Sequence, residues 1–456
     1  MTRARRIACL LTSTFWFGCG GGNGSHGAGD MAMMASSPDL SPPPSTLTEG
    51  QVDTMRMNCA FTANQLTEST MPMGTRTGKQ LPIDHIILIM QENRSFDHYF
   101  SELGIPGLDV ASRDLTNPDS TGAPVQRFHF TTKCMGGGDH SWPTEHSNLD
   151  SGALDGFVRD NNDSHTPMGY YDAGDLPYYY ALATTFAISD THFSSALAPT
   201  WPNRMFYFAG TSFGYTDNEF PPGMDPNGKT YPNIFNQLDA VGVDWKVYAQ
   251  DTPTPDIVAI SLLVNEPEHF LNTANFASDV AAGNLAPVTL VEASDVKGAA
   301  SPDEGPPGDV DVGQAFTSGV IGAVMSSPVW KTSAIFLSYD ENGGMYDHVV
   351  PPAACPPDDI PVMNGGGSTF NQYGFRVPFF VISPFAKRGY VSHVVTDHTS
   401  ILRFVESRFD IPAMSRRDAN AEPAYDMFDF ANPDYSVPTL PTITIDQAAL
   451  NTCLGQ

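Results

Sequence analysis

Acidic side chains follow two short apolar runs of this 456-residue chain, near the point where each run ends. Glu92 comes just after the run 83–90, and Asp340 and Glu341 come just after the run 334–338. Such runs predict buried parallel strands, and the carboxyl ends of parallel strands meet at one edge of a sheet. Because three neighbouring carboxylates repel one another, a bound cation would stabilise them. The sequence therefore predicts a site for one divalent metal ion. The alternative is that each carboxylate caps a separate turn.

The donor types narrow the choice of metal. Carboxylate oxygens favour a hard cation such as Ca²⁺, Mg²⁺ or Mn²⁺, and Zn²⁺ stays open as a fourth choice.

Thr200 is the candidate nucleophile. It precedes Trp201-Pro202, and a proline at a first helical position predicts a helix over 203–210. A hydroxyl at the entrance of a helix can be deprotonated by a metal and attack phosphorus, while free backbone N–H groups hold the phosphate oxygens. The alternative is that Thr200 only caps this helix.

Several further polar side chains could donate to a phosphoryl oxygen or protonate a leaving alkoxide. Each histidine among them could equally be a capping or core residue. Asn93 could offer its amide to the phosphate, and Asp347 is a possible site residue beside His348. The candidates are Asn93, His140, His146, Asp347, His348 and His398.

The order of predicted elements indicates an α/β fold. Apolar runs alternate with helix-period stretches, of which 316–324 and 401–409 are the clearest, the latter preceded by Thr399-Ser400 as expected caps. This alternation predicts a mostly parallel central sheet covered on both faces. The runs lie at 83–90, 186–189, 243–249, 288–291, 334–338 and 377–382. We predict one catalytic domain over residues 51–456.

The N-terminus has the pattern of an export signal. Three arginines precede the apolar stretch 7–17, which is too short to span a bilayer. Residues 1–18 are predicted as a signal peptide of lipoprotein type, with Cys19 as the lipidated residue; ordinary cleavage nearby is the alternative. Residues 19–50 are rich in Gly, Ser and Pro and predict a flexible tether. We expect an exported protein, either an outer-surface or periplasmic lipoprotein or a secreted one.

Composition limits the partners and the compartment. The net charge of −28 disfavours binding to nucleic acid, and the sequence indicates no obligate protein partner. Membrane contact is expected only through the N-terminal lipid or the substrate. Four cysteines beyond the N-terminal region suit two disulfides in an oxidising compartment, with three pairings open. These are Cys59, Cys134, Cys355 and Cys453.

Several blocks in this sequence resemble, in order, the signatures of the bacterial phosphoesterase family, which includes secreted phospholipases C and acid phosphatases. The opening block is 83–100, with the text IDHIILIMQENRSFDHYF, and the metal block is 339–349, with the text YDENGGMYDHV. Between them, Asp139-His140-Ser141-Trp142 and the stretch 199–204 resemble the second and nucleophile blocks. Residues 377–384 and 397–400 resemble the C-terminal part.

The resemblance implies an alkaline-phosphatase-like three-layer α/β/α sandwich and a set of residue roles. Glu92, Thr200, Asp340 and Glu341 would hold the metal, with Thr200 as the nucleophile that forms a phospho-threonine intermediate. The residues expected to contact the phosphoryl group are Asn93, His140 and His348.

One departure from the family pattern stands out: Gly305 occupies the place of a histidine that usually precedes Pro-Pro. Either another histidine, such as His269, replaces that contact, or the activity or substrate is altered. The leading hypothesis is a phospholipase C acting on a phospholipid or a small phosphate ester. The alternatives are an acid phosphatase acting on monoesters and a non-catalytic surface lipoprotein that binds phosphate esters.

Overall fold

The computed structural model describes residues 45–219, 231–294, 298–363 and 369–455. The chain divides after Pro42, and the unit that follows, Pro43–Gln456, contains the whole fold. The predicted signal peptide 1–18, Cys19 and most of the tether 19–50 lie outside the described residues. The first helix, α1, begins at Glu49, just before the predicted start of the domain at residue 51.

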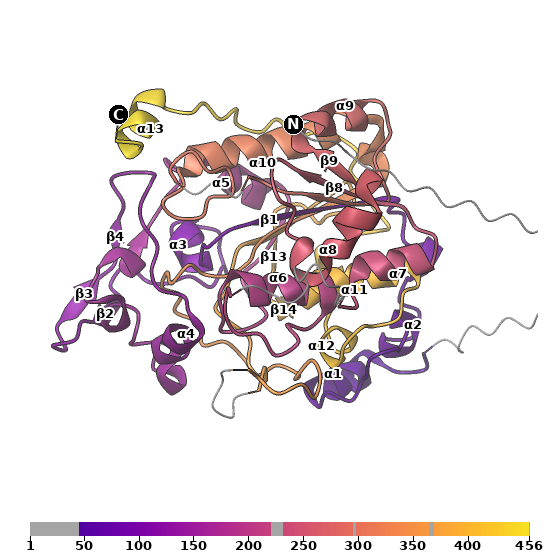
Figure 1. The fold of residues 1–456 in the computed structure, drawn as a ribbon, viewed down its shortest axis with the longest axis horizontal. Coiled ribbons are helices and arrows are strands. Elements are labelled where there is room, and N and C mark those ends of the chain that lie inside the picture. Colours follow the sequence, from indigo (N-terminus) through magenta and orange to yellow (C-terminus); the bar gives the residue numbers. More distant parts are fainter. Residues whose placement is uncertain (1–44, 220–230, 295–297, 364–368, 456) are drawn as a thin grey trace, which may run out of the picture. The chain divides into compact units, whose positions relative to one another are not determined.

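An eight-stranded sheet forms the centre of this unit, in the order β13-β6-β12-β11-β1-β10-β8-β9 (Figure 1). Every pairing in it is parallel except the two made by β12. The strands are β1 (His85–Gln91), β6 (Ala187–Ser189), β8 (Trp245–Ala249), β9 (Phe270–Asn272), β10 (Val288–Val291), β11 (Ser333–Tyr339), β12 (Phe379–Ile382) and β13 (Tyr390–Ser392).

Three two-stranded sheets accompany the large one. They pair β14 (Thr396–Asp397) with β7 (His192–Phe193), β2 (Thr116–Pro118) with β3 (Pro124–Gln126), and β4 (Phe128–His129) with β5 (Gly169–Tyr170).

Helices lie on both faces of the sheet, with α10 on one side of β1 and α6 and α11 on the other (Figure 1). Six of the helices are α5 (Pro177–Thr185), α6 (Thr200–Ala209), α7 (Ile234–Ala240), α8 (Asp256–Asn265), α10 (Val310–Met325) and α11 (His398–Phe409). The others are α1 (Glu49–Met57), α2 (Thr67–Thr70), α3 (Phe96–Phe100), α4 (Trp142–Leu149), α9 (Phe276–Ala281), α12 (Arg416–Ala419) and α13 (Gln447–Cys453). The predicted α/β/α sandwich with a mostly parallel sheet is confirmed.

The apolar runs form strands because the sheet is buried on both faces. All seven residues of β11 are buried, as are all but the first residue of β1. All six predicted strands are present. The short edge strands β9 and β13 were not predicted, because three partly exposed residues carry too little apolar signal.

Two helix starts differ from prediction. The cap of α11 is Asp397, whose backbone N–H donates to the Ser400 hydroxyl, rather than Thr399-Ser400. Helix α6 begins at Thr200 and not at residue 203, so Pro202 lies inside its first turn. A proline fits there because first-turn N–H groups have no helical partner.

Two disulfides close the fold, as the even cysteine count suggested. The pairs are Cys59–Cys355 and Cys134–Cys453, with Cα atoms 5.5 and 6.1 Å apart. The second bridge ties the C-terminal helix α13 to the loop that leads to His140.

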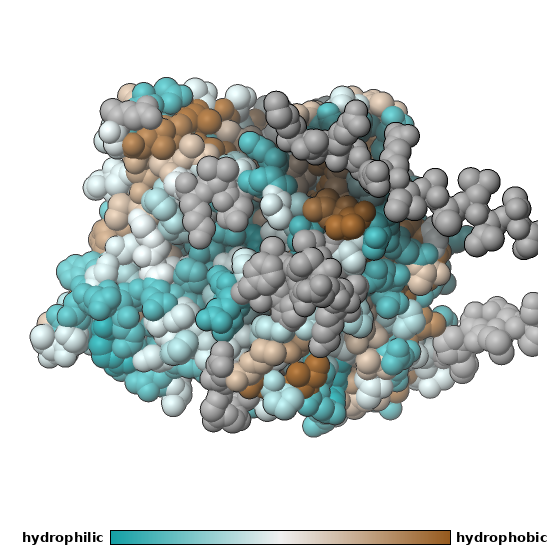
Figure 2. Space-filling model, in the orientation of Figure 1, coloured by the Kyte–Doolittle hydropathy of each residue, from teal (hydrophilic) through white to brown (hydrophobic). Residues whose placement is uncertain are grey.

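The face drawn in Figure 2 is largely hydrophilic, with apolar side chains in small separate patches. Among the described helices, none combines the length and the apolar character that crossing a bilayer requires.

Candidate active site

The parallel pairing of β1 with β11 brings the predicted acids to one edge of the sheet. Gln91 is in register with Tyr339, so Glu92 and Asp340 leave adjacent strands side by side. The backbone N–H groups of Asn93 and Glu341 both donate to Asp340 Oδ1, at 2.9 and 2.8 Å. The prediction that the strand ends bring the side chains of Glu92 and Asp340 close together is confirmed.

The turn after β11 explains the paired glycines in its sequence. Gly343 and Gly344 both have positive φ, and a Cβ on Gly343 would lie 2.4 Å from the carbonyl oxygen of Asn93. This close approach lets the Gly343 N–H donate to Glu341 Oε2 at 2.6 Å. The glycines therefore fold the Glu341 carboxylate back against the turn that carries Asn93.

Helix α6 presents Thr200 from its first position, where the residue is buried with 8% of its surface exposed. Arg204 follows one turn later and therefore lies on the same face of the helix. Its guanidinium contacts both acids: Nε lies 3.3 Å from Asp340 Oδ2, and Nη2 lies 3.4 Å from Glu92 Oε1. The face of α6 that carries Thr200 is thus directed at the strand ends.

Arg204 is a site residue that sequence reasoning missed. It is buried, and a third carboxylate, Glu292 at the end of β10, lies 4.0 Å from its Nη1. Burial lowers the pKa of Arg204, but Asp340 and Glu92 outweigh burial and raise it, so the side chain is a fixed cation. Its spacing of four residues from Thr200 was the signal available in the sequence.

Two buried oxygen atoms at this edge lack a hydrogen-bond partner among the described residues: Glu341 Oε1 and Asn93 Oδ1. Burial raises the pKa of Glu341 to about 8, and Asp340 adds to the shift while His140 opposes it. Oxygen atoms that only accept hydrogen bonds suit a hard cation. The residues present therefore fit the divalent metal that the sequence predicts.

Three other groups of acids and histidines have ligand atoms that already lie within 4.8 Å of one another among the described residues. They are Asp97-Asp347-His348, His129-Asp172-Asp175 and Asp239-Glu266-His269. The predicted set of Glu92, Asp340 and Glu341 is not among these groups. In the structure, the Arg204 guanidinium contacts both Glu92 and Asp340.

His140 joins the acids from the loop before α4. Its Nδ1 lies 3.0 Å from the carbonyl oxygen of Gly138, which accepts its hydrogen. Its Nε2 consequently lies toward the site, 3.5 Å from Glu341 Oε1 and 3.3 Å from Asn93 Nδ2. Burial lowers the pKa of His140, but Glu341, the hydrogen bond to Gly138 and the nearby Asp340 and Asp139 together outweigh burial and raise it.

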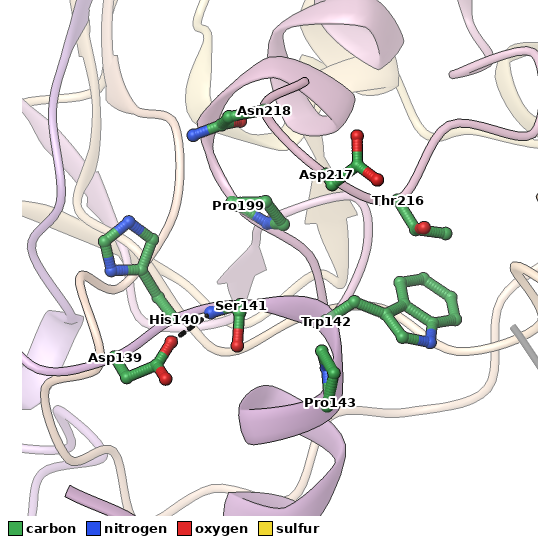
Figure 3. A pocket seen from close by; sticks show the side chains of 9 residues that line it. All are labelled: Asp139, His140, Ser141, Trp142, Pro143, Pro199, Thr216, Asp217 and Asn218. Atoms are coloured by element: carbon green, nitrogen blue, oxygen red, sulfur yellow. Dashed lines mark hydrogen bonds between the residues drawn. The ribbon is translucent and has the colours of Figure 1, made fainter. Parts of the chain in front are cut away.

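A pocket of about 380 Å³ opens between His140 and the residue before Thr200. Figure 3 shows its walls, which come from the start of α4, the start of α6 and the segment 216–218. Its lining residues are Asp139, His140, Ser141, Trp142, Pro143, Pro199, Thr216, Asp217 and Asn218.

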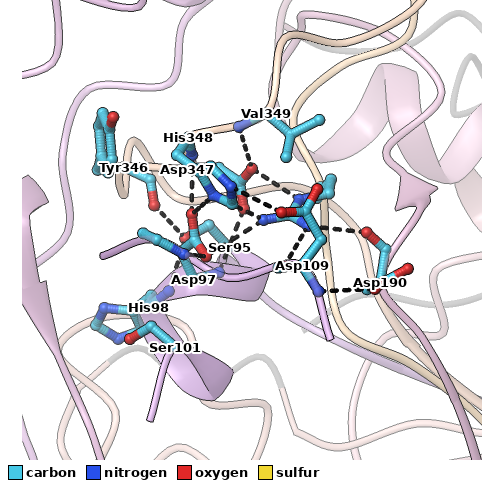
Figure 4. Close-up of polar contacts among 12 residues, drawn as sticks. Ser95, Asp97, His98, Ser101, Asp109, Asp190, Tyr346, Asp347, His348 and Val349 are labelled. Carbon is cyan, nitrogen blue, oxygen red and sulfur yellow. Dashed lines mark hydrogen bonds and ion pairs between the residues drawn. The ribbon is translucent and has the colours of Figure 1, made fainter. Parts of the chain in front are cut away.

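His348 and Asp347 lie in a second cluster (Figure 4). His348 Nδ1 is 2.6 Å from Asp97 Oδ2, and Nε2 is 3.1 Å from Asp109 Oδ1. The Arg376 guanidinium, fully buried, pairs with Asp347 at 2.8 Å and Asp97 at 3.2 Å. These contacts occupy both ring nitrogens of His348, so its contact with a phosphoryl group stays a prediction.

His146 and His398, the other two possible site residues, have structural contacts. His146 Nδ1 lies 2.7 Å from the carbonyl oxygen of Trp142, and the centres of the two rings lie 4.2 Å apart with their planes tilted by 41°. His398 is fully buried, with Nε2 2.7 Å from the backbone oxygen of Asp340. Burial lowers the pKa of both histidines, which favours the neutral rings. Only His398 contacts a predicted site residue, through the backbone of Asp340.

Gly305 packs directly on the predicted metal ligand Glu92. A Cβ at this position would lie 2.8 Å from Glu92 Oε2. His269 does not replace the absent histidine, because its Nδ1 lies 2.6 Å from the carbonyl oxygen of Trp245, at the start of β8. Strands β8, β10 and β1 run parallel, so His269 lies at the opposite edge of the sheet from Glu92.

The comparisons with known proteins agree with this architecture. The model of the Phosphoesterase family matches residues 83–412. Phospholipase C B of Mycobacterium tuberculosis is 31% identical to the chain, over 81% of the chain and 82% of the relative. The non-hemolytic phospholipase C of Pseudomonas aeruginosa is 30% identical, but the chain covers only 60% of it.

Similarity extends to plants and, at the level of the fold, to distant solved structures. The non-specific phospholipase C6 of Arabidopsis thaliana is 29% identical over 78% of this chain and 73% of that one. A protein in the alkaline phosphatase superfamily from Vibrio parahaemolyticus covers 83% of this chain, and the match spans 79% of that protein, with a TM-score of 0.41 and 8% identity.

The family match and the relatives named phospholipase C identify the chain as a phosphoric ester hydrolase. The chain belongs to the Phosphoesterase family.

Proposed function

We propose that the chain is a metal-dependent phosphodiesterase of phospholipase C type, with Thr200 as its nucleophile. One observation carries the proposal: Arg204 contacts both strand-end acids from the same face of α6 that presents Thr200. The relatives named phospholipase C at about 30% identity support the substrate class.

In this proposal the chain's own groups bind and orient the ester. The first turn of α6 offers backbone N–H groups to the phosphoryl oxygens, and the Asn93 amide, 3.3 Å from His140, lies within reach of the same group. Glu92, Thr200, Asp340 and Glu341 would hold the metal. The side-chain oxygen of Asn93, which accepts no hydrogen bond among the described residues, would lie beside them. A bound divalent ion supplies charge stabilisation at phosphorus and makes the threonine hydroxyl more acidic.

The chemical steps follow from the positions of Thr200 and His140. Thr200 Oγ1 attacks phosphorus in line with the ester oxygen of the diacylglycerol, and a phospho-threonine diester forms as that bond breaks. Protonated His140, whose pKa is raised, donates a proton from Nε2 to the departing oxygen. Neutral His140 then takes a proton from water, and the resulting hydroxide attacks phosphorus. The Thr200 oxygen leaves and regains from solvent the proton that it released to solvent when it attacked.

The decisive experiment replaces the nucleophile. We expect Thr200→Ala to lower kcat on p-nitrophenyl phosphorylcholine by about 10³-fold or more, since the covalent step is lost. Thr200→Ser should retain part of the activity. A matched control is Thr67→Ala, which removes another buried threonine from the first position of a helix. Turnover by Thr200→Ala within ten-fold of the wild type would refute the mechanism.

A second readout tests the intermediate and the metal separately. Acid quenching during turnover, followed by peptide mass spectrometry, should find one phosphoryl ester on Thr200. A chelator should abolish turnover, and a named metal should restore it. Turnover of p-nitrophenyl phosphate alone would instead assign the acid phosphatase alternative, and absence of all turnover in the metal-loaded protein would assign the binding-protein alternative.

Export of the mature chain remains part of this proposal. The two disulfides support an oxidising compartment.

A further inference from the structure

Glu304 is a fully buried carboxylate that the chemical steps do not use. It lies in the turn between β10 and α10, and its two oxygen atoms accept hydrogen bonds from four side chains. The hydroxyls of Tyr99 and Tyr339 donate to Oε2 at 2.6 and 2.7 Å. The Tyr179 hydroxyl donates to Oε1, and Gln91 Nε2 lies 3.4 Å from the same atom. The side chain is therefore held from four directions.

Two of these four donors stand directly before predicted metal ligands. Gln91 and Tyr339 are the last residues of β1 and β11, and the residues that follow them are Glu92 and Asp340. Gln91 and Tyr339 are paired in register, so their side chains share one face of the sheet. Gln91 Nε2 also donates to the carbonyl oxygen of Pro302 at 2.9 Å, in the same turn. The buried carboxylate thus joins the two strand ends that carry the acids.

The turn that carries Glu304 also holds Glu92 directly. The Glu92 N–H donates to the carbonyl oxygen of Asp303 at 2.8 Å, and Gly305 packs against the Glu92 carboxylate. The Arg94 guanidinium donates to the carbonyl oxygen of Glu304, from Nε at 3.0 Å and from Nη2 at 2.5 Å. The residues on both sides of Glu304 therefore contact Glu92, one at its main chain and one at its carboxylate.

The backbone is adapted to place the Glu304 side chain in the core. Glu304 has a φ of +70°, in the left-handed region that costs free energy for a residue with a Cβ. Helix α10 has Gly313 where the Glu304 side chain lies, since a Cβ on Gly313 would come within 1.9 Å of Glu304 Cγ. The hydrogen bonds of the carboxylate offset the cost of this backbone conformation.

We propose, building on the metal site of the function proposed above, that Glu304 is a positioning residue for Glu92 and Asp340. Its carboxylate holds the ends of β1 and β11 through Gln91 and Tyr339, and its turn fixes the main chain of Glu92. Glu304 acts through these residues and contacts neither the metal nor the ester. Its contribution is to hold the two acids at the separation that a divalent ion requires.

The test measures metal affinity without turnover. The chelator-treated full chain is titrated calorimetrically with Mn²⁺, an ion that suits carboxylate ligands, at a temperature where circular dichroism shows each variant to be folded. We expect Glu304→Gln, which keeps the volume but replaces one acceptor oxygen by a donor, to raise the Kd for Mn²⁺ by about ten-fold or more. The matched control is Glu406→Gln. Glu406 is also fully buried and pairs with Arg403 within α11 at 2.8 Å, so this change should lower stability and leave the Kd within about two-fold.

A second pair of variants tests whether Glu304 acts through its hydrogen bonds. Tyr179 donates to Glu304 from α5, while the hydroxyl of its neighbour Tyr178 has no hydrogen-bond partner among the described residues. We expect Tyr179→Phe to raise the Kd for Mn²⁺ by about three-fold or more and Tyr178→Phe to leave it within about two-fold. In the double variant Glu304→Gln/Tyr179→Phe, the increase should fall short of the product of the two single increases, because both changes remove the same contact.

An equal rise in Kd for Glu304→Gln and Glu406→Gln would overturn the proposal, as would equal effects of Tyr179→Phe and Tyr178→Phe. If Glu304→Gln does not fold, the two tyrosine variants decide alone. Turnover of p-nitrophenyl phosphorylcholine separates this proposal from the proposed function. If Mn²⁺ binding weakens in Glu304→Gln while the wild type hydrolyses no ester, the positioning role stands and the proposed function falls. If Thr200→Ala abolishes turnover while the Kd is unchanged in Glu304→Gln, the function stands and the positioning role falls.

Discussion

At the scale of single residues, the site depends on how tightly small groups pack against the acids. Gly305 is the clearest case, since its Cα leaves just enough room for Glu92. The Asp97–Arg376–His348 cluster is a second case, because three buried or half-buried charges hold the loop that follows Asp340. Each case leads to a prediction.

Gly305→Ala should weaken metal binding more than it weakens the fold. The new Cβ would lie 2.8 Å from Glu92 Oε2, at the far end of a flexible side chain, so Glu92 can move aside at little cost in stability. Because Glu92 is a predicted metal ligand, we expect the metal Kd, measured by calorimetry, to rise about ten-fold or more. Gly136→Ala, whose Cβ would meet nothing within 4 Å, is the control. An unchanged Kd would contradict the place of Glu92 in the metal site.

Asp97→Asn should destabilise the fold in a pH-dependent way. Burial raises the pKa of Asp97, but Arg376 and His348 outweigh burial and lower it to about 2. A lowered native pKa contributes stability that is present above pH 4 and is lost as the pH falls toward 2. At pH 5 we expect a loss of about 3–5 kcal/mol in the free energy of unfolding, since Arg376 loses a buried partner.

The Asp97–Arg376–His348 cluster also predicts a loss of folding stability at higher pH. Burial lowers the pKa of His348, but Asp97 outweighs burial and raises it. The stabilisation from protonated His348 is therefore complete below about pH 6.5 and is lost as the pH rises through its folded pKa. Urea unfolding at several pH values measures the loss of stability at low pH and the loss at high pH. Asp109→Asn, whose carboxylate is 57% exposed, should cost about 1 kcal/mol or less; a larger loss there than in Asp97→Asn would contradict the assignment.

At the scale of elements, the site is a meeting of four segments that are far apart in the sequence. Strands β1 and β11 bring the acids, α6 brings Thr200, and the loop before α4 brings His140. The first three are fixed by the sheet and by the Arg204 ion pairs. The loop has no place in the sheet. The disulfide between Cys134 and Cys453 is one of its anchors, beside the hydrogen bond from the Gly138 N–H to the carbonyl oxygen of Gly343 and the ion pair between Lys133 and Asp311.

Removal of that disulfide should therefore affect catalysis as well as stability. We expect the double variant Cys134→Ser/Cys453→Ser to lose about 2–4 kcal/mol of stability and to raise KM, because Asp139 and His140 lose one of their anchors. The variant Cys59→Ser/Cys355→Ser removes the other bridge and should lower the melting temperature with a smaller change in KM. Thermal unfolding and steady-state kinetics on both variants distinguish an anchoring role from general stabilisation; equal changes in KM would contradict it.

At the scale of the whole molecule, one continuous sheet determines where the site residues lie, and a strongly negative net charge determines which ions collect around them. A net charge of −28 raises the local concentration of cations, including divalent metal ions. The sheet places every parallel strand end on the same edge, and the pocket of Figure 3 opens beside that edge.

The strands, the acids and the alcohol were predictable from the sequence because each has a local signal. A run of apolar residues identifies a buried strand, and a polar cluster after it identifies the carboxyl edge. Glu92 and Asp340 were placed at adjacent strand ends in this way, and the proline at position 202 placed Thr200 near the start of α6; the role of Thr200 as nucleophile stays a prediction. Arg204 was missed because its ion pairs join three segments that no local pattern connects.

The amino-acid sequence by itself determined the strands, the order of the motifs and the presence of an oxygen-rich site, because burial and turn chemistry act over a few residues. Only the tertiary structure decided the antiparallel direction of β12, the pairing of the four cysteines and the partners of His348. These three features depend on contacts between residues separated by tens to hundreds of positions. Such contacts stabilise the protein only after the sheet has brought the distant segments together.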